Sequence, residues 1–276
     1  LGEDLLQAAG GKGANQAVAA ARAGARVSLI SRVGRDAFGS GLITGLADCG
    51  VDVSGVDSDE RATGVALICV DHHGQNQIVV ASGANEALAA HHIEALRGAI
   101  IDSKVLVAQL EIPIASVIAA LSVASEAGVM TILNPAPVRS LPPFVVKMTD
   151  ILVANEVEAE ALVGQPIGTV PEVRRALAQL EKMGYTNAVI TQGRRGAMWR
   201  AGGTHGRVRA YPVEAVDATA AGDTFVGYLA VAMAEGAELG EAVEWANQAA
   251  AITVTRRGAR DAIPTRAEVT RSFPPN

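Results

Sequence analysis

The sequence is poor in aromatic side chains and in cysteine. Phe, Trp and Tyr make up 3% of its 276 residues, whereas hydrophobic residues, mostly Ala, Val, Leu and Ile, make up 49%. Such a composition suits a buried parallel sheet flanked by helices rich in small residues. The two cysteines, Cys49 and Cys69, fit no C-x-x-C spacing. We therefore expect two structural thiols in a reduced, cytoplasmic setting.

The chain also lacks an excess of basic residues and a long apolar run. Its formal net charge of −6 at pH 7 offers no positive field for nucleic acid. No apolar run approaches the roughly 20 residues that span a bilayer, and no charged-then-apolar leader is visible. We expect neither nucleic acid nor membrane as a partner. The opening LGEDLLQAAGGKGANQ has no initiating Met and no strand, so we expect an N-terminal segment to be absent from the sequence as given.

Two other kinds of chemistry find no support. The sequence contains no G-x-S-x-G motif, which disfavours hydrolysis by a Ser/His/Asp triad. The histidine pairs at 72–73 and 91–92 have no Cys, His or carboxylate at a ligand spacing. Adjacent residues of a strand point to opposite faces, so neither pair is expected to bind a metal.

Segments typical of strands and helices alternate along the chain. The expected strands are residues 25–34, 104–111, 129–137, 150–155 and 187–193, and the expected helices are residues 14–24, 113–128, 171–184, 224–234 and 239–255. This rhythm predicts a parallel sheet with right-handed crossovers. Residues 64–81 differ, because two β-rich runs joined by a polar, Gly-containing turn predict a hairpin. Without repeats or linkers, residues 1–276 are expected to form one α/β domain with this hairpin as an appendage.

Polar residues or glycine follow four of the predicted strands. They are Glu111, Asn134, Asn155 and Gly193. In open parallel sheets ligands bind beyond the carboxyl ends of the strands. We expect these residues to border one shared cleft.

The stretch GGKGANQA, residues 10–17, is the first candidate for ligand binding. It lacks the last glycine of the dinucleotide fingerprint, and it is not a P-loop because Gly13 follows Gly-Lys. Its glycines allow close approach of a ligand, and Lys12 and Asn15 supply donors for hydroxyls or phosphate. The alternative is a flexible loop that caps the following helix.

The stretch DATAAGDTFVGYLA, residues 217–230, is the second candidate. A helix N-terminus carries unpaired N–H groups and a partial positive charge that suit an anion. Asp223, behind Ala220, Ala221 and Gly222, could accept a proton from a hydroxyl. The alternative is a helix cap, which leaves the small residues and Asp217 unexplained.

Two weaker candidates lie between them. In NEVEAE, residues 155–160, Asn155, Glu156 and Glu158 could face metal-bound phosphate directly or through water. Acidic residues in a first helical turn are equally expected for the helix dipole. The turn at 191–196 could border a nucleotide or be an ordinary β-turn.

Together and in this order, these stretches resemble the ribokinase-like, PfkB-type family of carbohydrate kinases. GGKGANQAVAAARAGA is similar to its first signature and DATAAGDTFVGYLA to its second, and NPAP, NEVEAE and AAITVTRRGA also have counterparts. The resemblance, from Gly10 to about Pro264, implies a three-layer α/β/α fold with a mostly parallel sheet and a small β-lid at about 64–81. It also implies a homodimer through that lid. The implied reaction is ATP-dependent phosphorylation of the 5-hydroxyl of D-ribose, with Mg²⁺ on the phosphates and K⁺ as activator.

The resemblance also implies roles for individual residues. Asp223 would be the base, and the backbone of Ala220, Ala221, Gly222 and Asp223 would form the anion hole. The sugar would be held by Gly11, Lys12, Gly13, Ala14, Asn15, Glu111 and Asp223. ATP would contact Asn155, Thr191, Gln192, Gly193, Arg194, Arg195, Gly196, Gly222 and Asn247, the last standing where many relatives have His. K⁺ would be bound by Asp217, Thr219, Thr253, Arg256, Gly258 and Ala262, several through backbone carbonyls, and Glu158 would reach Mg²⁺ through water.

One departure from the family pattern leaves alternatives open. Family members open with a strand that carries an Asn-x-Asp pair for the sugar hydroxyls, and we expect that pair in the absent N-terminal segment. The alternatives are a related kinase for another sugar or a nucleoside, a non-catalytic sugar-binding protein, and a dinucleotide-dependent dehydrogenase. The incomplete G-x-G-x-x-G pattern disfavours the last.

Overall fold

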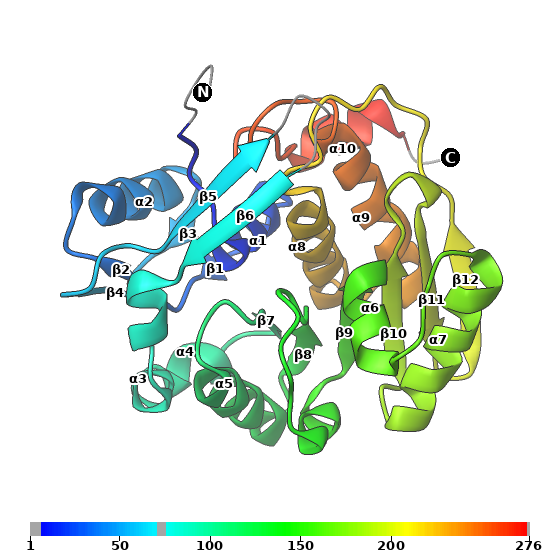
Figure 1. The fold of residues 1–276 in the computed structure, drawn as a ribbon, viewed down its shortest axis with the longest axis horizontal. Coiled ribbons are helices and arrows are strands. Elements are labelled where there is room, and N and C mark those ends of the chain that lie inside the picture. The colour runs from blue at the N-terminus through cyan, green and yellow to red at the C-terminus, as the bar shows by residue number, and fades with distance from the viewer. Residues whose placement is uncertain (1–6, 71–75, 275–276) are drawn as a thin grey trace.

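The computed structural model describes residues 7–70 and 76–274. A six-stranded sheet with the order β12-β11-β10-β9-β8-β7 forms its centre (Figure 1). The strands are β7 (Val105–Ala108), β8 (Met130–Leu133), β9 (Ile151–Asn155), β10 (Asn187–Thr191), β11 (Ala197–Ala201) and β12 (Thr204–Val208). β7 to β10 are parallel, and β11 and β12 continue the sheet antiparallel. The predicted mostly parallel sheet is confirmed.

Helices cover both faces of this sheet. α5 (Ile114–Ala127), α6 (Glu156–Val163) and α7 (Val170–Met183) lie on one face, and α1 (Lys12–Arg22), α8 (Ala221–Ala234) and α9 (Leu239–Thr253) lie on the other. β9 shows why two layers form. Its Ile151 and Val153 enter one buried cluster, whereas Leu152 and Ala154 enter the other, because successive side chains of a strand point to opposite faces. The three-layer α/β/α architecture is confirmed.

The first part of the chain differs in detail from the prediction. The strand expected at 25–34 is split into β1 (Val27–Ser28), which pairs with β3 (Val51–Asp52), and β2 (Ser31–Gly34), which pairs with β4 (Val56–Asp59). The split occurs because the segment that pairs with residues 27–34 turns at residues 53–55. The two segments therefore cannot form one continuous ladder. The other helical elements along the described chain are α2 (Ala37–Asp48), η1 (Gly83–Ala87), α3 (Ala90–Ala95), α4 (Arg97–Ile101), η2 (Pro143–Met148), η3 (Gly193–Arg195) and α10 (Arg266–Ser272).

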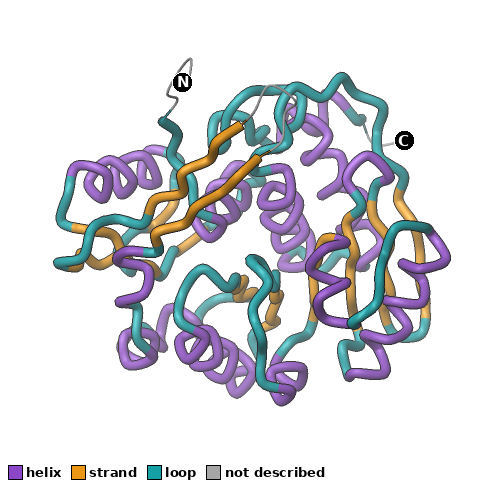
Figure 2. Tube along the Cα trace, viewed as in Figure 1, coloured by secondary structure: helices purple, strands orange, loops and turns teal. Residues whose placement is uncertain are grey.

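The predicted hairpin is present. β5 (Val65–Val70) and β6 (Asn76–Ala81) pair antiparallel, with Val65 opposite Ala81. Figure 2 shows the two strands standing apart from the central sheet. The joining residues 71–75, which include His72 and His73, lie outside the described residues. Large apolar side chains are exposed here, and Leu67, Val79 and Val80 are 61%, 60% and 64% exposed.

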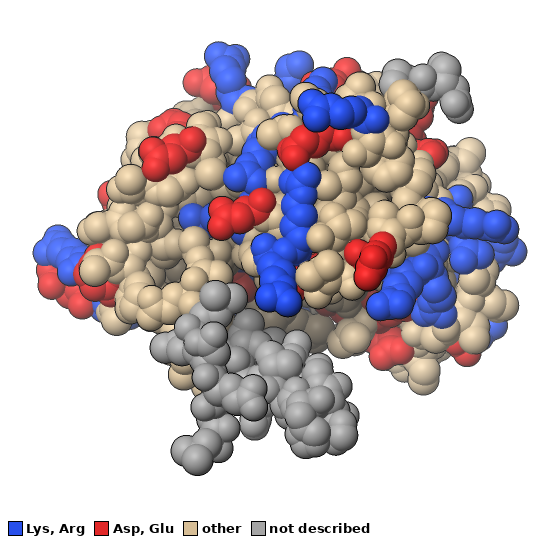
Figure 3. All heavy atoms as spheres, turned by 90° about the horizontal axis from the view of Figure 1, so that it is seen from above, with Lys and Arg blue, Asp and Glu red and all other residues tan. Residues whose placement is uncertain are grey.

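Two properties of the described surface concern membranes and charge. Within residues 7–70 and 76–274, no helix combines the length and apolarity needed to cross a bilayer. On the face drawn in Figure 3, basic and acidic side chains lie interspersed. That face therefore presents no uniform positive field of the kind that attracts nucleic acid.

Candidate active site

The candidate site forms where α1 and α8 lie side by side (Figure 1). Small residues permit the close contact: a Cβ placed on Gly227 of α8 would lie 2.6 Å from the Cβ of Ala19 on α1. Both helices begin earlier than predicted, at Lys12 and Ala221. The first turns of the two helices, one from each signature stretch, therefore meet at one point.

Asp223 lies in the first turn of α8, but its carboxylate does not cap that helix. The N-cap is Ala220, which has φ 59° and makes no side-chain cap hydrogen bond. Instead, the side-chain amide of Asn15 donates to Oδ2 of Asp223 at 2.8 Å, and that of Gln16 donates to Oδ1 at 3.0 Å. Only 9% of Asp223 is exposed. The cap interpretation is wrong, and α1 supplies the partners of this carboxylate.

The N-terminus of α8 can receive an anion beside Asp223. The N–H groups of Gly222 and Asp223 have no hydrogen-bond partner among the described residues. A Cβ on Gly222 would meet nothing within 4 Å, so the space next to these donors is open. Ala220 alone among the described non-glycine residues has a positive φ. Such conformations cluster at functional sites, where the surrounding structure maintains them.

The glycine-rich stretch 10–14 reaches the same site through Glu111. Gly11, with φ 94°, is the N-cap of α1, a conformation that favours glycine. The backbone N–H of Lys12 donates to the Glu111 carboxylate at 2.8 Å. The Oδ1 atom of Asn15 is buried without a partner in the part of the chain that the structure describes, and it can accept a bond from a ligand hydroxyl.

These residues border one large cleft, whose volume is about 3130 Å³. Residues of the hairpin also line it, which places β5 and β6 beside the ligand space. The predicted site residues on its walls are Gly11, Lys12, Gly13, Ala14, Asn15, Glu111, Asn155, Glu158, Thr219, Ala220 and Asp223. The structure thus brings the predicted sugar residues and the predicted base together.

The carboxylates of this cleft share one electrostatic setting. Burial raises the pKa of Asp223, of Glu111 and of Glu158 above the ordinary values. The positive charge of Lys12 opposes the pKa rise in all three. A carboxylate with a raised pKa is a better proton acceptor than an exposed one, so this environment suits general base chemistry.

Asn155 and Glu158 cap the helix that they begin, and their contact with metal-bound phosphate stays a prediction. They form a capping box at the start of α6, in which Glu158 N–H donates to Asn155 Oδ1 at 2.9 Å and Asn155 N–H donates to Glu158 Oε2 at 2.9 Å. Both also line the cleft. Within the described ranges no three His, Cys, Asp or Glu side chains form a metal cluster. One carboxylate that acts through water fits Mg²⁺, which keeps several waters and binds phosphate.

The predicted nucleotide residues form a continuation of this edge. Thr191 lies next to Asn155 in the parallel ladder, and Arg195 pairs with Glu156. The side chain of Gln192 is buried at 4% exposure, so it presents no surface to a ligand. Asn247 on α9 donates to the carbonyl of Arg209 at 2.8 Å, and residues 208–210 lie directly against Gly196. The turn 191–196 and Asn247 are not on the described walls of the large cleft, but a chain of direct neighbours joins them to it.

Asp217 ties the two predicted cation segments together. Its Oδ1 accepts from the backbone N–H of Thr219 at 2.9 Å, and its Oδ2 accepts from the N–H of Gly258 at 3.0 Å. The hydroxyl of Thr253 bonds to Ala249 and Thr224 inside the helices. The Arg256 side chain pairs with Glu268. Because their side chains are used in this way, Thr253 and Arg256 could offer a cation only their backbone carbonyls. Backbone carbonyls are also the ligands that the resemblance implies at several of these positions.

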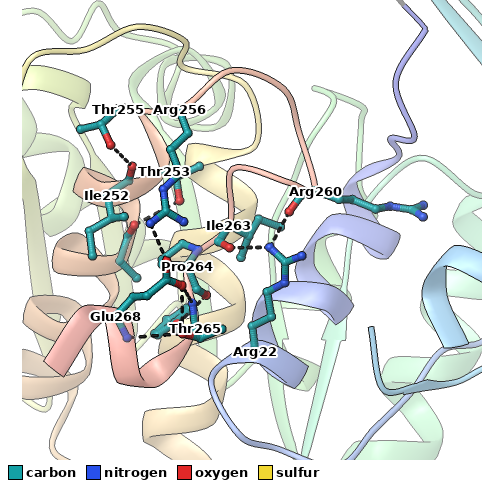
Figure 4. A network of polar contacts seen from close by, with 12 residues as sticks. Arg22, Ile252, Thr253, Thr255, Arg256, Arg260, Ile263, Pro264, Thr265 and Glu268 are labelled. Atoms are coloured by element: carbon teal, nitrogen blue, oxygen red, sulfur yellow. Dashed lines mark hydrogen bonds and ion pairs between the residues drawn. The ribbon is translucent and has the colours of Figure 1, made fainter. Parts of the chain in front are cut away.

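Arg22 holds the loop that contains Ala262 (Figure 4). Its guanidinium donates to the carbonyl of Arg260 at 2.8 Å and to that of Ile263 at 2.5 Å. Ala262 itself is fully buried. The contact connects the end of α1 to the predicted cation loop, so the first signature and the C-terminal segment are one structural unit.

From the sequence, no role was assigned to the amide side chains that hold Asp223 in place. Gln16, Gln109 and Asn134 form a hydrogen-bonded chain that ends at the carboxylate. Only Asn134 stood out, as a polar residue at a strand end. Gln16 carries a weak signal, a buried amide on an Ala-rich helix, and its partners could be recognised only in three dimensions.

Comparisons with known proteins agree with this geometry. Residues 1–266 match the pfkB family of carbohydrate kinases. The ribokinase of Haemophilus influenzae is 38% identical over 268 residues, which cover 97% of this chain and 88% of that protein. The bifunctional ribokinase/ribose-5-phosphate isomerase A of Fructilactobacillus sanfranciscensis is 39% identical over 259 residues, 93% of this chain, but this chain spans only 48% of that protein.

A solved structure extends the likeness to the fold. Arabidopsis thaliana ribokinase, complexed with ribose and ATP, superposes with a TM-score of 0.94 at 31% identity, over 99% of this chain and 90% of that chain. Family match, fold and the convergence of both signature stretches at Asp223 lead to the same conclusion. This chain belongs to the pfkB family of carbohydrate kinases, which are phosphotransferases acting on sugars.

Proposed function

We propose that this chain is a ribokinase, which transfers the γ-phosphoryl group of ATP to the 5-hydroxyl of D-ribose. The observation that carries the proposal is the buried Asp223 carboxylate, held by Asn15 at the open N-terminus of α8 and in one cleft with Glu111. The similarity of this chain to ribokinases, one of them solved with ribose and ATP, supports the choice of substrates.

In this mechanism Asp223 takes the proton of the attacking hydroxyl. Phosphoryl transfer depends on positioning and on charge stabilisation rather than on covalent chemistry. The backbone from Ala220 to Asp223, above all the N–H groups of Gly222 and Asp223 that have no partner among the described residues, would stabilise the negative charge of the transferred group. One such donor is typically worth about 2.7–4 kcal/mol. A well-placed base adds roughly 10²–10⁴-fold.

The sugar is bound by the first turn of α1 and by Glu111. Gly11, Lys12, Gly13 and Ala14 provide backbone and amine groups, and the unpartnered Oδ1 of Asn15 accepts a sugar hydroxyl. ATP would lie along Asn155, the turn 191–196 apart from the buried side chain of Gln192, and Asn247, so that its terminal phosphate reaches the start of α8.

Two cations complete the proposed site. Mg²⁺ neutralises phosphate charge, and Glu158 would hold it through water. K⁺ would be bound by carbonyls of Thr253, Arg256, Gly258 and Ala262 beside Asp217 and Thr219, next to the start of α8. The residues present fit such an ion, since Asp217 brings negative charge to a loop of carbonyl oxygens.

The hairpin has a proposed role of its own. β5 and β6 border the cleft and would act as a lid that excludes water from the reaction. Their exposed Leu67, Val79 and Val80 would contact the lid of a second copy in a homodimer. We regard residues 1–276 as one kinase domain with this lid, acting in the cytoplasm, where ATP is available.

A sugar panel tests the proposal most directly. ADP release is measured with pentoses, hexoses and nucleosides, and D-ribose is expected to give the highest kcat/KM. Asp223→Asn is expected to abolish sugar-dependent release and to keep ATP binding. Asp48→Asn, which changes an exposed aspartate at the end of α2, is the matched control.

Each alternative function gives a different result in this panel. A preference for another sugar or a nucleoside would identify a related kinase. Sugar binding by calorimetry without ADP release from any substrate would identify a non-catalytic sugar-binding protein. Near wild-type turnover of Asp223→Asn would refute the role of the base.

A further inference from the structure

Three side-chain amides from three separate parts of the fold form a hydrogen-bonded chain that ends at Asp223. Gln109 follows β7, Gln16 lies on α1 and Asn134 follows β8. Gln109 Nε2 donates to Gln16 Oε1 at 2.5 Å, and Gln16 Nε2 donates to Asp223 Oδ1 at 3.0 Å and to Asn134 Oδ1 at 3.2 Å. Both N–H bonds and the oxygen of the Gln16 amide are therefore used.

The direction of this chain is set by a backbone carbonyl. Asn134 Nδ2 lies 2.9 Å from the carbonyl oxygen of Val153, which can only accept. Asn134 must therefore present its oxygen to Gln16, and Gln16 must present its NH₂ group to Asn134 and to Asp223. A reversed Gln16 amide would place its oxygen against two other acceptors. At the far end Gln109 donates to the Gln16 oxygen and holds the same direction.

We propose that Gln16 is a positioning residue for the reaction, because its directed N–H group fixes Oδ1 of Asp223 as an acceptor and holds the carboxylate in one orientation. The inference rests on the proposed role of Asp223 as base. With Asn15 on Oδ2 and Gln16 on Oδ1, the carboxylate keeps a defined lone pair for the sugar hydroxyl. Gln16 is 3% exposed, so it acts through Asp223 and not on the substrate.

The charges around Asp223 and the hydrogen bond from Gln16 together set the pKa of this carboxylate. Lys12 on α1, Glu111 after β7 and Glu158 on α6 are the ionisable groups that interact with it. Burial raises the pKa of Asp223, whereas Lys12, Asn15 and Gln16 oppose the rise. Removal of the Gln16 donor raises this pKa further. A base must be unprotonated, so activity is lost as the pH falls through the pKa of Asp223. Without the Gln16 donor, this loss of activity is expected at a higher pH.

The test replaces Gln16 with methionine, which has a similar length and no donor. With D-ribose and saturating ATP, or the most active sugar of the panel, kcat is expected to fall about 10- to 100-fold, the loss of a hydrogen bond to a charged group. The KM for the sugar is expected to stay unchanged. The acid limb of the kcat profile is expected to move up by about one pH unit or more.

Two further variants keep the result interpretable. Gln179→Met changes an exposed glutamine of α7 and is expected to leave kcat, KM and the pH profile unchanged. Gln109→Met keeps the Gln16 amide but removes one of the two contacts that hold its direction, so a smaller loss of kcat and a smaller pH shift in the same direction are expected. It tests the proposal even if Gln16→Met does not fold, which a melting curve and ATP binding would reveal.

The outcomes separate this inference from the proposed function. If Asp223→Asn is inactive while folded Gln16→Met and Gln109→Met keep the wild-type kcat and pH profile, the positioning role is wrong and the base assignment stands. If Asp223→Asn is active, the base assignment fails first. A lower melting temperature of Gln16→Met with an unchanged pH profile would show a purely structural residue and overturn the inference.

Discussion

Gly227→Ala tests how strictly the site depends on the contact between α1 and α8. A Cβ at this position would lie 2.6 Å from the Cβ of Ala19, 2.7 Å from the carbonyl oxygen of Gln16 and 2.9 Å from the amide nitrogen of Ala20. These are backbone atoms and a Cβ, which cannot rotate away. Extending the 2.6 Å approach to an ordinary contact of about 3.4 Å requires the helices to separate by about 0.8 Å.

That separation would break the bonds that hold Asp223. Adding about 0.8 Å to the 2.8 Å and 3.0 Å bonds from Asn15 and Gln16 takes both beyond hydrogen-bonding length. A misplacement of about 1 Å at a catalytic group can cost about 100-fold in rate. We therefore expect kcat to fall about 10- to 100-fold in the ADP-release assay.

The stability effect has two opposing parts. Alanine gains about 1 kcal/mol over glycine in a helix interior, and overpacking costs about 1–3 kcal/mol. Three approaches to rigid atoms place the cost near the upper limit, so we expect a net loss of about 2 kcal/mol. At about 2–4 °C per kcal/mol, the melting temperature should fall by about 4–8 °C.

Gly98→Ala in α4 is the matched control, because a Cβ there meets nothing within 4 Å and Gly98 is not among the described lining residues of the cleft. It should keep full activity and melt at the same or a slightly higher temperature. Full activity and an undiminished melting temperature in Gly227→Ala would refute the argument that close helix packing positions Asp223.

Three further predictions address other parts of the molecule. K⁺ should stimulate ADP release more than Na⁺ at equal ionic strength, and it should raise the melting temperature more. Arg22→Met frees the carbonyls beside the cation loop, so it should raise the K⁺ concentration that gives half of the maximal effect on ADP release and on the melting temperature. The backbone N–H of Thr265 and the Arg256 guanidinium lower the pKa of Glu268 from 4.5 to about 2. The stabilisation from this carboxylate is therefore complete above about pH 4.5 and lost as the pH falls toward 2, so Glu268→Gln should flatten the dependence of the unfolding free energy on pH across that window. Leu67→Lys on the exposed face of β5 should convert a dimer to a monomer in sedimentation equilibrium.

Each of these predictions has a control and a contrary result. Equal rates and melting temperatures in K⁺ and Na⁺ would contradict the cation loop. Glu214→Gln, at an exposed glutamate, should leave the pH dependence of stability unchanged, and the same flattening in both variants would contradict the assignment to Glu268. Val213→Lys, at an exposed apolar residue outside the hairpin, should not affect association. An unchanged dimer in Leu67→Lys would argue against the lid contact.

Local patterns in the sequence determined the class of fold. The alternation of β-rich and helix-forming segments predicted the parallel sheet and its covering layers, since hydrophobic periodicity and chain connectivity are local properties. The hairpin also followed from two β-rich runs and a polar turn. The break of the strand expected at 25–34 did not, because it depends on where the partner strands β3 and β4 end.

The same division holds for the site. The residue types in the two signature stretches pointed to Asp223, Asn15 and Lys12, since a carboxylate and donors near a helix start carry recognisable chemistry. Whether Asp223 capped its own helix or faced another element could not be read from its neighbours in the chain. That choice depends on α1 lying against α8, which joins residues 208 positions apart. Only the tertiary structure turns the carboxylate toward Asn15 and Gln16 and sets the direction of the amide chain beneath it, because these bonds link side chains from distant elements.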